Sequence, residues 1–440
     1  MPSFPTARGV SALLGPALAA TALTLPTAVV PAASASSGAP ASAAPTAARA
    51  QAEPAGRLIT YREWASGKQL AQGAREDTYV SKGALRLRSK APVRQVGDRR
   101  YQAGTWTSPW TWPGYGLTEM VASWDARTPG DSWIRVEARG RSAGRESSWD
   151  TLGEWTSGEA RERTTISGQD DDLARVNVDT LQATTAAGLH SWQLRVTLFK
   201  RDGSTTGVPS VDTVGAMVSR LPDDSRVATS RTGPARGKVL DVPRYSQMVH
   251  RGHSPQWGGG GEAWCSPTSV SMVLDHYDAL PSEAEYAWTG PGHTAGFVDH
   301  AARMSYDHGY DGAGNWPFNT AYATQHVSDA FVTRLRSLRE AERFIAAGIP
   351  LVASIRFDAG QLSGAPISSS NGHLLVIVGF TRTGDVVVND PAASSRDGVR
   401  RVYDRAQFEN VWIPTSGGLV YVIRDGQPLP KRVAGSTRNW

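Results

Sequence analysis

The chain has 440 residues, which is enough for two domains that each bury a hydrophobic core. Charged residues make up 20% of it and hydrophobic residues 40%, a balance that excludes a wholly disordered chain. The net charge of +5 is spread along the sequence without a dense Lys/Arg block, so we expect no nucleic-acid binding, although the excess suits contact with an anionic cell wall.

The N-terminal segment has the pattern of an export signal. Residues 10–30 are small and apolar, Arg8 is the only charge before them, and Ala33-Ser34-Ala35 offers small residues for cleavage. This pattern predicts a signal peptide over residues 1–35 and hence a secreted protein, which a cell wall could retain. A membrane anchor is the alternative, but prolines interrupt the segment and no basic cluster follows, so we expect no stable membrane span. Residues 36–55 are rich in Ala, Pro and Ser and are expected to form a disordered spacer.

Residues 56–221 predict an all-β domain. Apolar and polar residues alternate with period two over residues 133–139, 175–179 and 192–198, and turn-forming residues separate these runs. The pattern favours an antiparallel β-sandwich or jelly roll. The many tryptophans of this domain favour core packing over a sugar-stacking surface, with Trp110-Thr111-Trp112 as the pair expected at the surface. A glycan contact through this domain is the alternative.

A second domain is expected after a polar linker over residues 222–238. Helical periodicity appears over residues 267–277, 297–308 and 337–347. Short apolar runs follow and predict strands, at residues 351–355, 374–378, 386–388 and 419–423. Helices first and strands afterwards indicate an α+β domain over residues 239–426 with a late antiparallel sheet, followed by a tail over residues 427–440.

Cys265 is the only cysteine, so the chain forms no intramolecular disulfide. In an exported protein such a residue is either buried and inert or a reactive thiol. Cys265 follows a run of four glycines and precedes a predicted helix, with Pro267 suited to the first turn. The positive end of a helix stabilises a thiolate, which is the nucleophilic form. The position therefore favours a catalytic cysteine.

His373 is the candidate base for that thiol. It follows a polar loop and opens an apolar strand, which places it at the rim of a sheet facing a cleft. Asn389 and Asp390 end the next strand, close to His373 if the two strands are antiparallel neighbours. Asp390 is the preferred orienting group, because a carboxylate also stabilises the imidazolium, and Asn389 is the alternative. Gln247, upstream of the nucleophile, is the candidate oxyanion donor together with the backbone N–H of Cys265.

Four segments together carry a family resemblance. They are Tyr245-Ser246-Gln247, Glu262-Ala263-Trp264-Cys265-Ser266-Pro267-Thr268-Ser269, Gly372-His373-Leu374-Leu375-Val376-Ile377-Val378-Gly379-Phe380 and Val388-Asn389-Asp390-Pro391. Residues 239–423 resemble the bacteriocin-processing peptidases, a C-thirty-nine-like group of cysteine peptidases with a papain-like fold. The resemblance implies a nucleophile Cys265, a base His373, an orienting Asp390 and an oxyanion donor Gln247.

Two features depart from that family pattern. Ser266 stands where a glycine commonly follows the nucleophile. The stretch from Gln247 to Cys265 is longer than the family pattern, and it carries His250 and His253 as well as the glycine run. The sequence shows no His-Glu-x-x-His motif and no other convincing metal-ligand spacing, so we expect no metal and no organic cofactor.

The sequence therefore predicts a secreted cysteine peptidase that acts on a peptide or protein, with cell-wall peptides among the candidates. One alternative uses the same residues as an amidase or transpeptidase on peptidoglycan stem peptides. Another is a wall- or glycan-binding protein whose papain-like domain is inactive.

Overall fold

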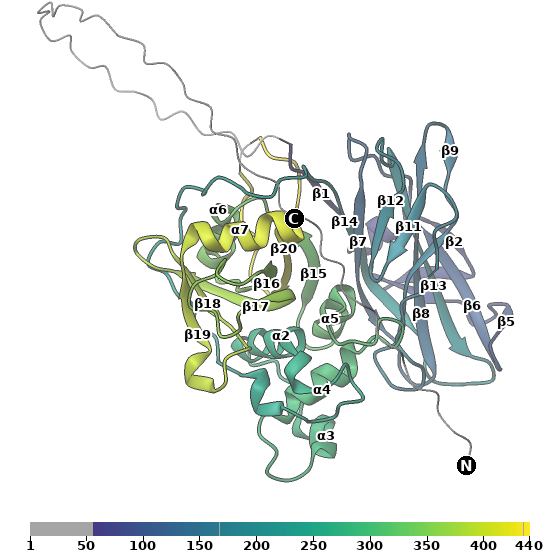
Figure 1. Cartoon of the computed structure of the whole chain (residues 1–440). Helices are drawn as coiled ribbons and strands as arrows, with labels where there is room; N and C mark the ends of the chain where they lie inside the picture. Colours follow the sequence, from purple (N-terminus) through teal and green to yellow (C-terminus); the bar gives the residue numbers. More distant parts are fainter. Residues whose placement is uncertain (1–55, 167, 434) are drawn as a thin grey trace, which may run out of the picture. The chain divides into compact units, whose positions relative to one another are not determined.

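The computed structural model describes residues 56–166, 168–433 and 435–440 (Figure 1). The predicted signal peptide and spacer lie outside the described residues. No helix within the described ranges is long and apolar enough to cross a membrane.

The N-terminal region is built from two antiparallel sheets, which confirms the all-β prediction. The first sheet has the order β11 (Ala174–Asn177), β12 (Thr180–Ala183), β7 (Glu119–Arg127), β14 (Ser210–Arg220), β4 (Ala84–Leu87) and β3 (Thr78–Ser81), with β1 (Leu58–Trp64) also paired to β14. The second has the order β10 (Asp150–Trp155), β8 (Ser132–Ser142), β13 (Ser191–Arg201), β6 (Arg99–Thr107) and β2 (Ala74–Glu76), with β5 (Val93–Val96) on β6 and β9 (Arg145–Glu146) on β8. A single short helix, α1 (Gly67–Leu70), follows β1 among the described residues of this region.

Tryptophan side chains join the two sheets. Trp64 of the first sheet meets Trp106 and Trp192 of the second edge-to-face, with ring centroids 5.4 and 6.0 Å apart. All three side chains are buried, so their main contribution is the apolar area that they remove from water. The prediction that these tryptophans serve packing is confirmed for Trp106.

The surface tryptophans differ from the prediction in one respect. Trp112 is 66% exposed, as expected, but Trp110 is half-buried. The guanidinium groups of Arg139 and Arg141 lie 5.0 and 3.7 Å from the centroid of the Trp110 ring. Cation–π contacts therefore occupy an aromatic surface that a sugar would need for stacking.

The C-terminal region has one antiparallel six-stranded sheet. Its order is β15 (Asp329–Arg334), β20 (Leu419–Arg424), β16 (Leu351–Phe357), β17 (Ser370–Phe380), β18 (Val386–Asn389) and β19 (Arg400–Tyr403). The α-helices are α2 (Cys265–His276), α3 (Glu283–Tyr286), α4 (Gly296–Ser305), α5 (Trp316–Ala323), α6 (Leu338–Ala346) and α7 (Arg405–Ser416). The 3-10 helices are η1 (Gln247–His250), η2 (Gly261–Ala263), η3 (Ala287–Thr289) and η4 (Arg396–Gly398).

The predicted helices correspond to α2, α4 and α6, and the four predicted strands lie in β16, β17, β18 and β20. The expected order of helices first and strands afterwards is wrong in two places. Strand β15 precedes α6, and α7 lies between β19 and β20. Helix α7 escapes prediction because Pro414 stands inside it, although Asp404 caps its start by accepting a hydrogen bond from Gln407 N at 2.8 Å.

Buried polar contacts connect the two regions. The Asp179 carboxylate accepts a hydrogen bond from Trp316 N at 2.8 Å, and Asp307 accepts one from Thr165 N at 2.9 Å. The strand expected over residues 175–179 is shorter in the structure. Strand β11 ends at Asn177, and the chain turns at Asp179 before β12 begins. The Asp179 contact places the β11–β12 hairpin beside the start of helix α5.

Candidate active site

Cys265 is the first residue of α2, whereas the sequence predicts it directly before the helix, and it is half-buried. The glycines before Cys265 allow the chain to pack closely against His250 just before the helix begins. Gly260 has a φ of +101°, which favours glycine, and a Cβ on Gly261 would lie 2.2 Å from the carbonyl oxygen of His250. A chain with side chains at these positions could not fold back so closely before the helix begins.

His373 lies on β17 and is 3% exposed, so it is more deeply buried than a residue at the rim of a sheet. Its Nε2 atom is 2.8 Å from Oδ1 of Asp390, which directly follows the neighbouring antiparallel strand β18. The ring's other nitrogen, Nδ1, is left for the hydrogen bond between His373 and Cys265. Three residues from separate elements therefore form one thiol–imidazole–carboxylate line.

The structure places Asp390 rather than Asn389 against the imidazole. Asp390 is 1% exposed, and its Oδ2 atom accepts a hydrogen bond from the Tyr403 hydroxyl at 2.7 Å. Asn389 instead donates to the carbonyl oxygens of Val242 and Pro243 at 3.2 and 2.9 Å. Asn389 thus ties β18 to the segment before Gln247, while Asp390 is held between His373 and Tyr403.

The electrostatics favour an ion pair between Cys265 and His373. Burial alone raises the pKa of the thiol, but the hydrogen bond and charge of His373 and the backbone N–H groups of Leu374 and Ser266 bring that pKa below its ordinary value. Burial opposes the charge on His373, yet Asp390 and Cys265 together raise its pKa to about 10. Both shifts therefore favour the thiolate–imidazolium pair over the neutral pair.

Gln247 is buried and tied to the segments on both sides of the site. Its side-chain amide donates a hydrogen bond to the carbonyl oxygen of Glu262, three residues before Cys265, and its backbone N–H donates to Pro391 O at 2.9 Å. A primary amide carries two N–H donors, so one is left for another acceptor. Gln247 is thus connected to the segment before the nucleophile and to the residue after Asp390.

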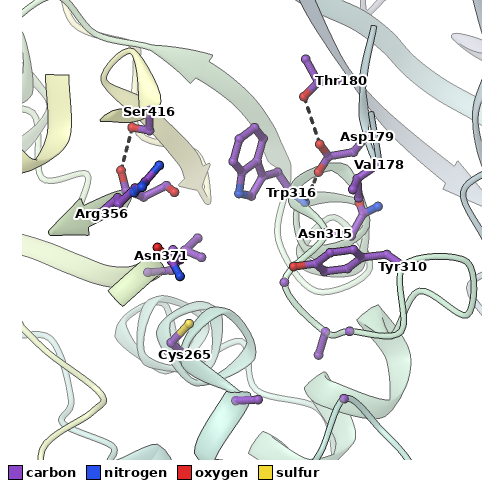
Figure 2. Close-up of a pocket in the computed structure, with 18 of the residues that line it drawn as sticks. Val178, Asp179, Thr180, Cys265, Tyr310, Asn315, Trp316, Arg356, Asn371 and Ser416 are labelled. Carbon is purple, nitrogen blue, oxygen red and sulfur yellow. Dashed lines mark hydrogen bonds between the residues drawn. The ribbon is translucent and has the colours of Figure 1, made fainter. Parts of the chain in front are cut away.

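A cleft of about 480 Å³ opens at Cys265. Figure 2 shows Cys265 below this space, with Asn371 and Arg356 on one side and Tyr310 and Trp316 on the other. Gly372 and Leu374, which flank His373, line the cleft, whereas the described lining includes neither His373 nor Gln247. The thiol is therefore the group of this set that faces the open space.

The β11–β12 hairpin of the N-terminal region also lines the cleft. Its contribution consists of Asn177, Val178, Asp179 and Thr180. Sequence analysis did not identify this wall, because it depends on how two separate regions pack. Tyr403 was missed for a similar reason, since its contact with Asp390 follows from the pairing of β18 with β19.

The structure also gathers three histidines and an aspartate that sequence analysis did not group, His250, His253, His293 and Asp299. Two of these histidines lie in the long stretch between Gln247 and Cys265. Their spacing along the chain gave no signal, because 39 residues separate His253 from His293 and only the fold brings them together.

Comparison with protein families matches both regions of the chain. Residues 60–219 match the model described as Peptidase C39 N-terminal domain, and residues 239–420 match that of the Peptidase_C39 like family. Comparison with curated proteins finds no match. The chain therefore carries a C39-like, papain-like cysteine peptidase domain preceded by a peptidase C39 N-terminal domain.

Proposed function

We propose that this protein is a secreted cysteine peptidase that hydrolyses peptide bonds through Cys265, His373 and Asp390. The observation that carries the proposal is the line from the half-buried thiol through a buried imidazole to a buried carboxylate, with Nε2 of His373 2.8 Å from Asp390. Its position beside an open cleft gives a substrate access to the thiol. Secretion rests on the apolar segment and small residues before position 36.

The proposed reaction starts from a Cys265 thiolate and a protonated His373. The Cys265 thiolate attacks the carbonyl carbon of the scissile peptide bond and forms a tetrahedral intermediate. The backbone N–H of Cys265 and the side-chain amide of Gln247 donate hydrogen bonds to its oxyanion. The C–N bond then breaks as His373 gives its proton to the leaving amine, which leaves a thioester on Cys265.

Water completes the cycle. Neutral His373 takes a proton from a water molecule, whose oxygen attacks the thioester carbon. The C–S bond breaks, the carboxylic acid leaves, and the thiolate and imidazolium are restored. Asp390 keeps the ring in one orientation and stabilises its positive charge during both proton transfers.

The test is a digest of protein, peptide-library and peptidoglycan substrates with the mature enzyme and its Cys265→Ala variant. We expect new peptide N-termini in the protein or peptide digests from the wild-type enzyme alone. Cleavage or cross-linking confined to peptidoglycan stem peptides would replace the proposal with an amidase or transpeptidase. If the thiol can be alkylated but the protein turns over none of these substrates, the alternative of an inactive wall- or glycan-binding protein would be favoured.

The oxyanion role predicts a selective loss of turnover in Gln247→Ala. We expect kcat to fall by about 10²- to 10³-fold, because the donor is used most strongly in the transition state, while KM changes little. Steady-state kinetics of the folded variant give the two constants separately. Gln407→Ala, on the outer helix α7, is the control and should keep the wild-type kcat. An unchanged kcat in Gln247→Ala would exclude this role.

Val178 lies in the wall of the cleft, and we expect its substitution by asparagine to stabilise the protein and to weaken substrate binding. This β-branched residue has a φ of +56°, a strained conformation that asparagine tolerates better. We expect Val178→Asn to raise the free energy of unfolding by about 1 kcal/mol. Because the variant also replaces an apolar side chain in the cleft, we expect its KM to rise by about tenfold.

Denaturant unfolding and peptide kinetics measure both effects. Ala143→Asn is the matched control, since Ala143 has a φ of +50° in the turn between β8 and β9 and does not line the cleft. It should gain stability and keep its KM. A wild-type KM in Val178→Asn would show that the hairpin does not contact the substrate.

A further inference from the structure

A buried carboxylate and three imidazoles meet beside the candidate active site. Asp299, on α4, is 1% exposed, and its Oδ2 atom lies 2.8 Å from Nδ1 of His250 and 2.8 Å from Nε2 of His293. Nδ1 of His253 lies 3.6 Å from the other carboxylate oxygen. The four candidate ligand atoms all lie within 4.8 Å of one another.

Hydrogen bonds within the protein leave part of this cluster unsatisfied. Nδ1 of His253 is buried without a hydrogen-bond partner, and 3.6 Å is too long for a hydrogen bond to Asp299. Such an orphaned nitrogen costs free energy unless another group binds its lone pair or its proton. A cation placed between the rings and the carboxylate would supply the missing bond for His253.

The donor set and its dimensions identify the kind of ion. Three imidazole nitrogens and one carboxylate oxygen are ligands of tetrahedral zinc, whereas calcium and magnesium require sites made of oxygen. With Zn–N bonds of about 2.0 Å, neighbouring ligand atoms of a tetrahedron stand about 3.3 Å apart. The measured separations of 2.8 and 3.6 Å lie on either side of that value.

The rings are arranged around a common centre. The His250 ring centroid lies 5.6 Å from that of His253 and 5.8 Å from that of His293, while the His253 and His293 centroids are 4.3 Å apart. Their ring planes are mutually inclined by 43 to 86° rather than stacked. Inclined rings that share a neighbour at short distance can direct their nitrogens to one point.

We propose that His250, His253, His293 and Asp299 bind a structural Zn²⁺ ion. Four protein ligands fill the tetrahedral coordination of the ion and leave no open position for a substrate. The ion joins the stretch after η1 to α4 and to the loop before it. His250 ends the 3-10 helix that begins with Gln247, so the ion also anchors the segment from which Gln247 projects.

The test is zinc binding by the mature full chain, without an affinity tag. After equilibration with zinc sulfate and gel filtration, elemental analysis should find one zinc per wild-type chain. We expect His253→Ala and His293→Ala to bind zinc at least about tenfold more weakly in a chelator competition. Removal of the ion with a chelator should lower the wild-type Tm and leave the Tm of these variants unchanged.

His308→Ala is the matched control. The His308 side chain is 37% exposed, as is that of His253, and its Nδ1 atom also lies 3.6 Å from a carboxylate oxygen. Among the described residues, however, His308 belongs to no cluster of potential metal ligands. The control should retain one zinc. Wild-type protein that takes up no zinc, or zinc affinity that is equal in the wild type and the His253→Ala and His293→Ala variants, would overturn the proposal. The zinc content of the wild type tests the proposal even if a variant fails to fold. Zinc content and zinc affinity are both measured without peptidase activity.

Discussion

Cys265→Ala should abolish peptide hydrolysis while leaving the fold intact, and His373→Ala should have nearly the same effect. Members of one nucleophile–base unit act together, and removing either costs about 10⁶-fold in kcat at comparable sites. In the proposed mechanism the thiol forms the bond to the substrate, and the imidazole keeps the thiol ionised and then protonates the leaving amine. Initial rates on the best peptide, with thermal unfolding of each variant, measure the effect.

His276→Ala is the control for the histidine substitution. His276 ends the same helix that Cys265 begins, and its Nδ1 atom lies 2.7 Å from the Asp241 carbonyl oxygen on the exposed side. The control should retain wild-type activity. Substantial hydrolysis by folded Cys265→Ala would show that the reaction takes place at another group.

Asp390→Asn should lower kcat by about 10⁴-fold, as in other triads whose carboxylate becomes an amide. Both carboxylate oxygens are in use, since Oδ1 faces His373 and Oδ2 accepts the Tyr403 hydroxyl. An amide offers one acceptor group and one donor group, so the Tyr403 hydroxyl would have to accept a hydrogen bond where it now donates one. The amide also removes the charge that raises the pKa of His373. The alkaline limit of activity, which reflects loss of the His373 proton, should therefore move to lower pH.

The kcat–pH profile of Asp390→Asn checks both expectations. Asp385→Asn is the control, because Asp385 precedes the strand that Asp390 follows and makes its contacts with Thr383 and Arg405. We expect that control to keep the wild-type rate and profile. A profile unchanged in Asp390→Asn would mean that the carboxylate does not act on His373.

Local sequence patterns were sufficient to predict the thiol–imidazole–carboxylate line. A cysteine at a helix start, a histidine at an apolar strand and an aspartate at the end of the next strand each follow from short segments. Antiparallel pairing of consecutive strands then brings His373 and Asp390 together. The sequence favours Asp390 over Asn389 because a carboxylate also stabilises an imidazolium, and the structure places Oδ1 of Asp390 2.8 Å from Nε2 of His373.

The rest of the site depends on contacts between distant segments. Val178 lines the cleft next to Asp179, whose carboxylate accepts a hydrogen bond from Trp316 N, 137 residues later. His253 and His293 meet at Asp299 although no local spacing links them. Such contacts arise from the packing of whole elements, which hydrophobic periodicity does not specify.

The most direct measurement is the rate of Cys265 alkylation by iodoacetamide as a function of pH, in the wild type and in His373→Ala. Iodoacetamide reports on a single thiol, because the chain has one cysteine. We expect the wild-type rate to show a thiol pKa below the free value of about 8.5. We expect His373→Ala to raise it, because burial then acts against the thiolate without the opposing imidazolium. A folded thiol that does not react, or one whose ordinary pKa is unaffected by His373→Ala, would contradict the ion pair and the peptidase mechanism built on it.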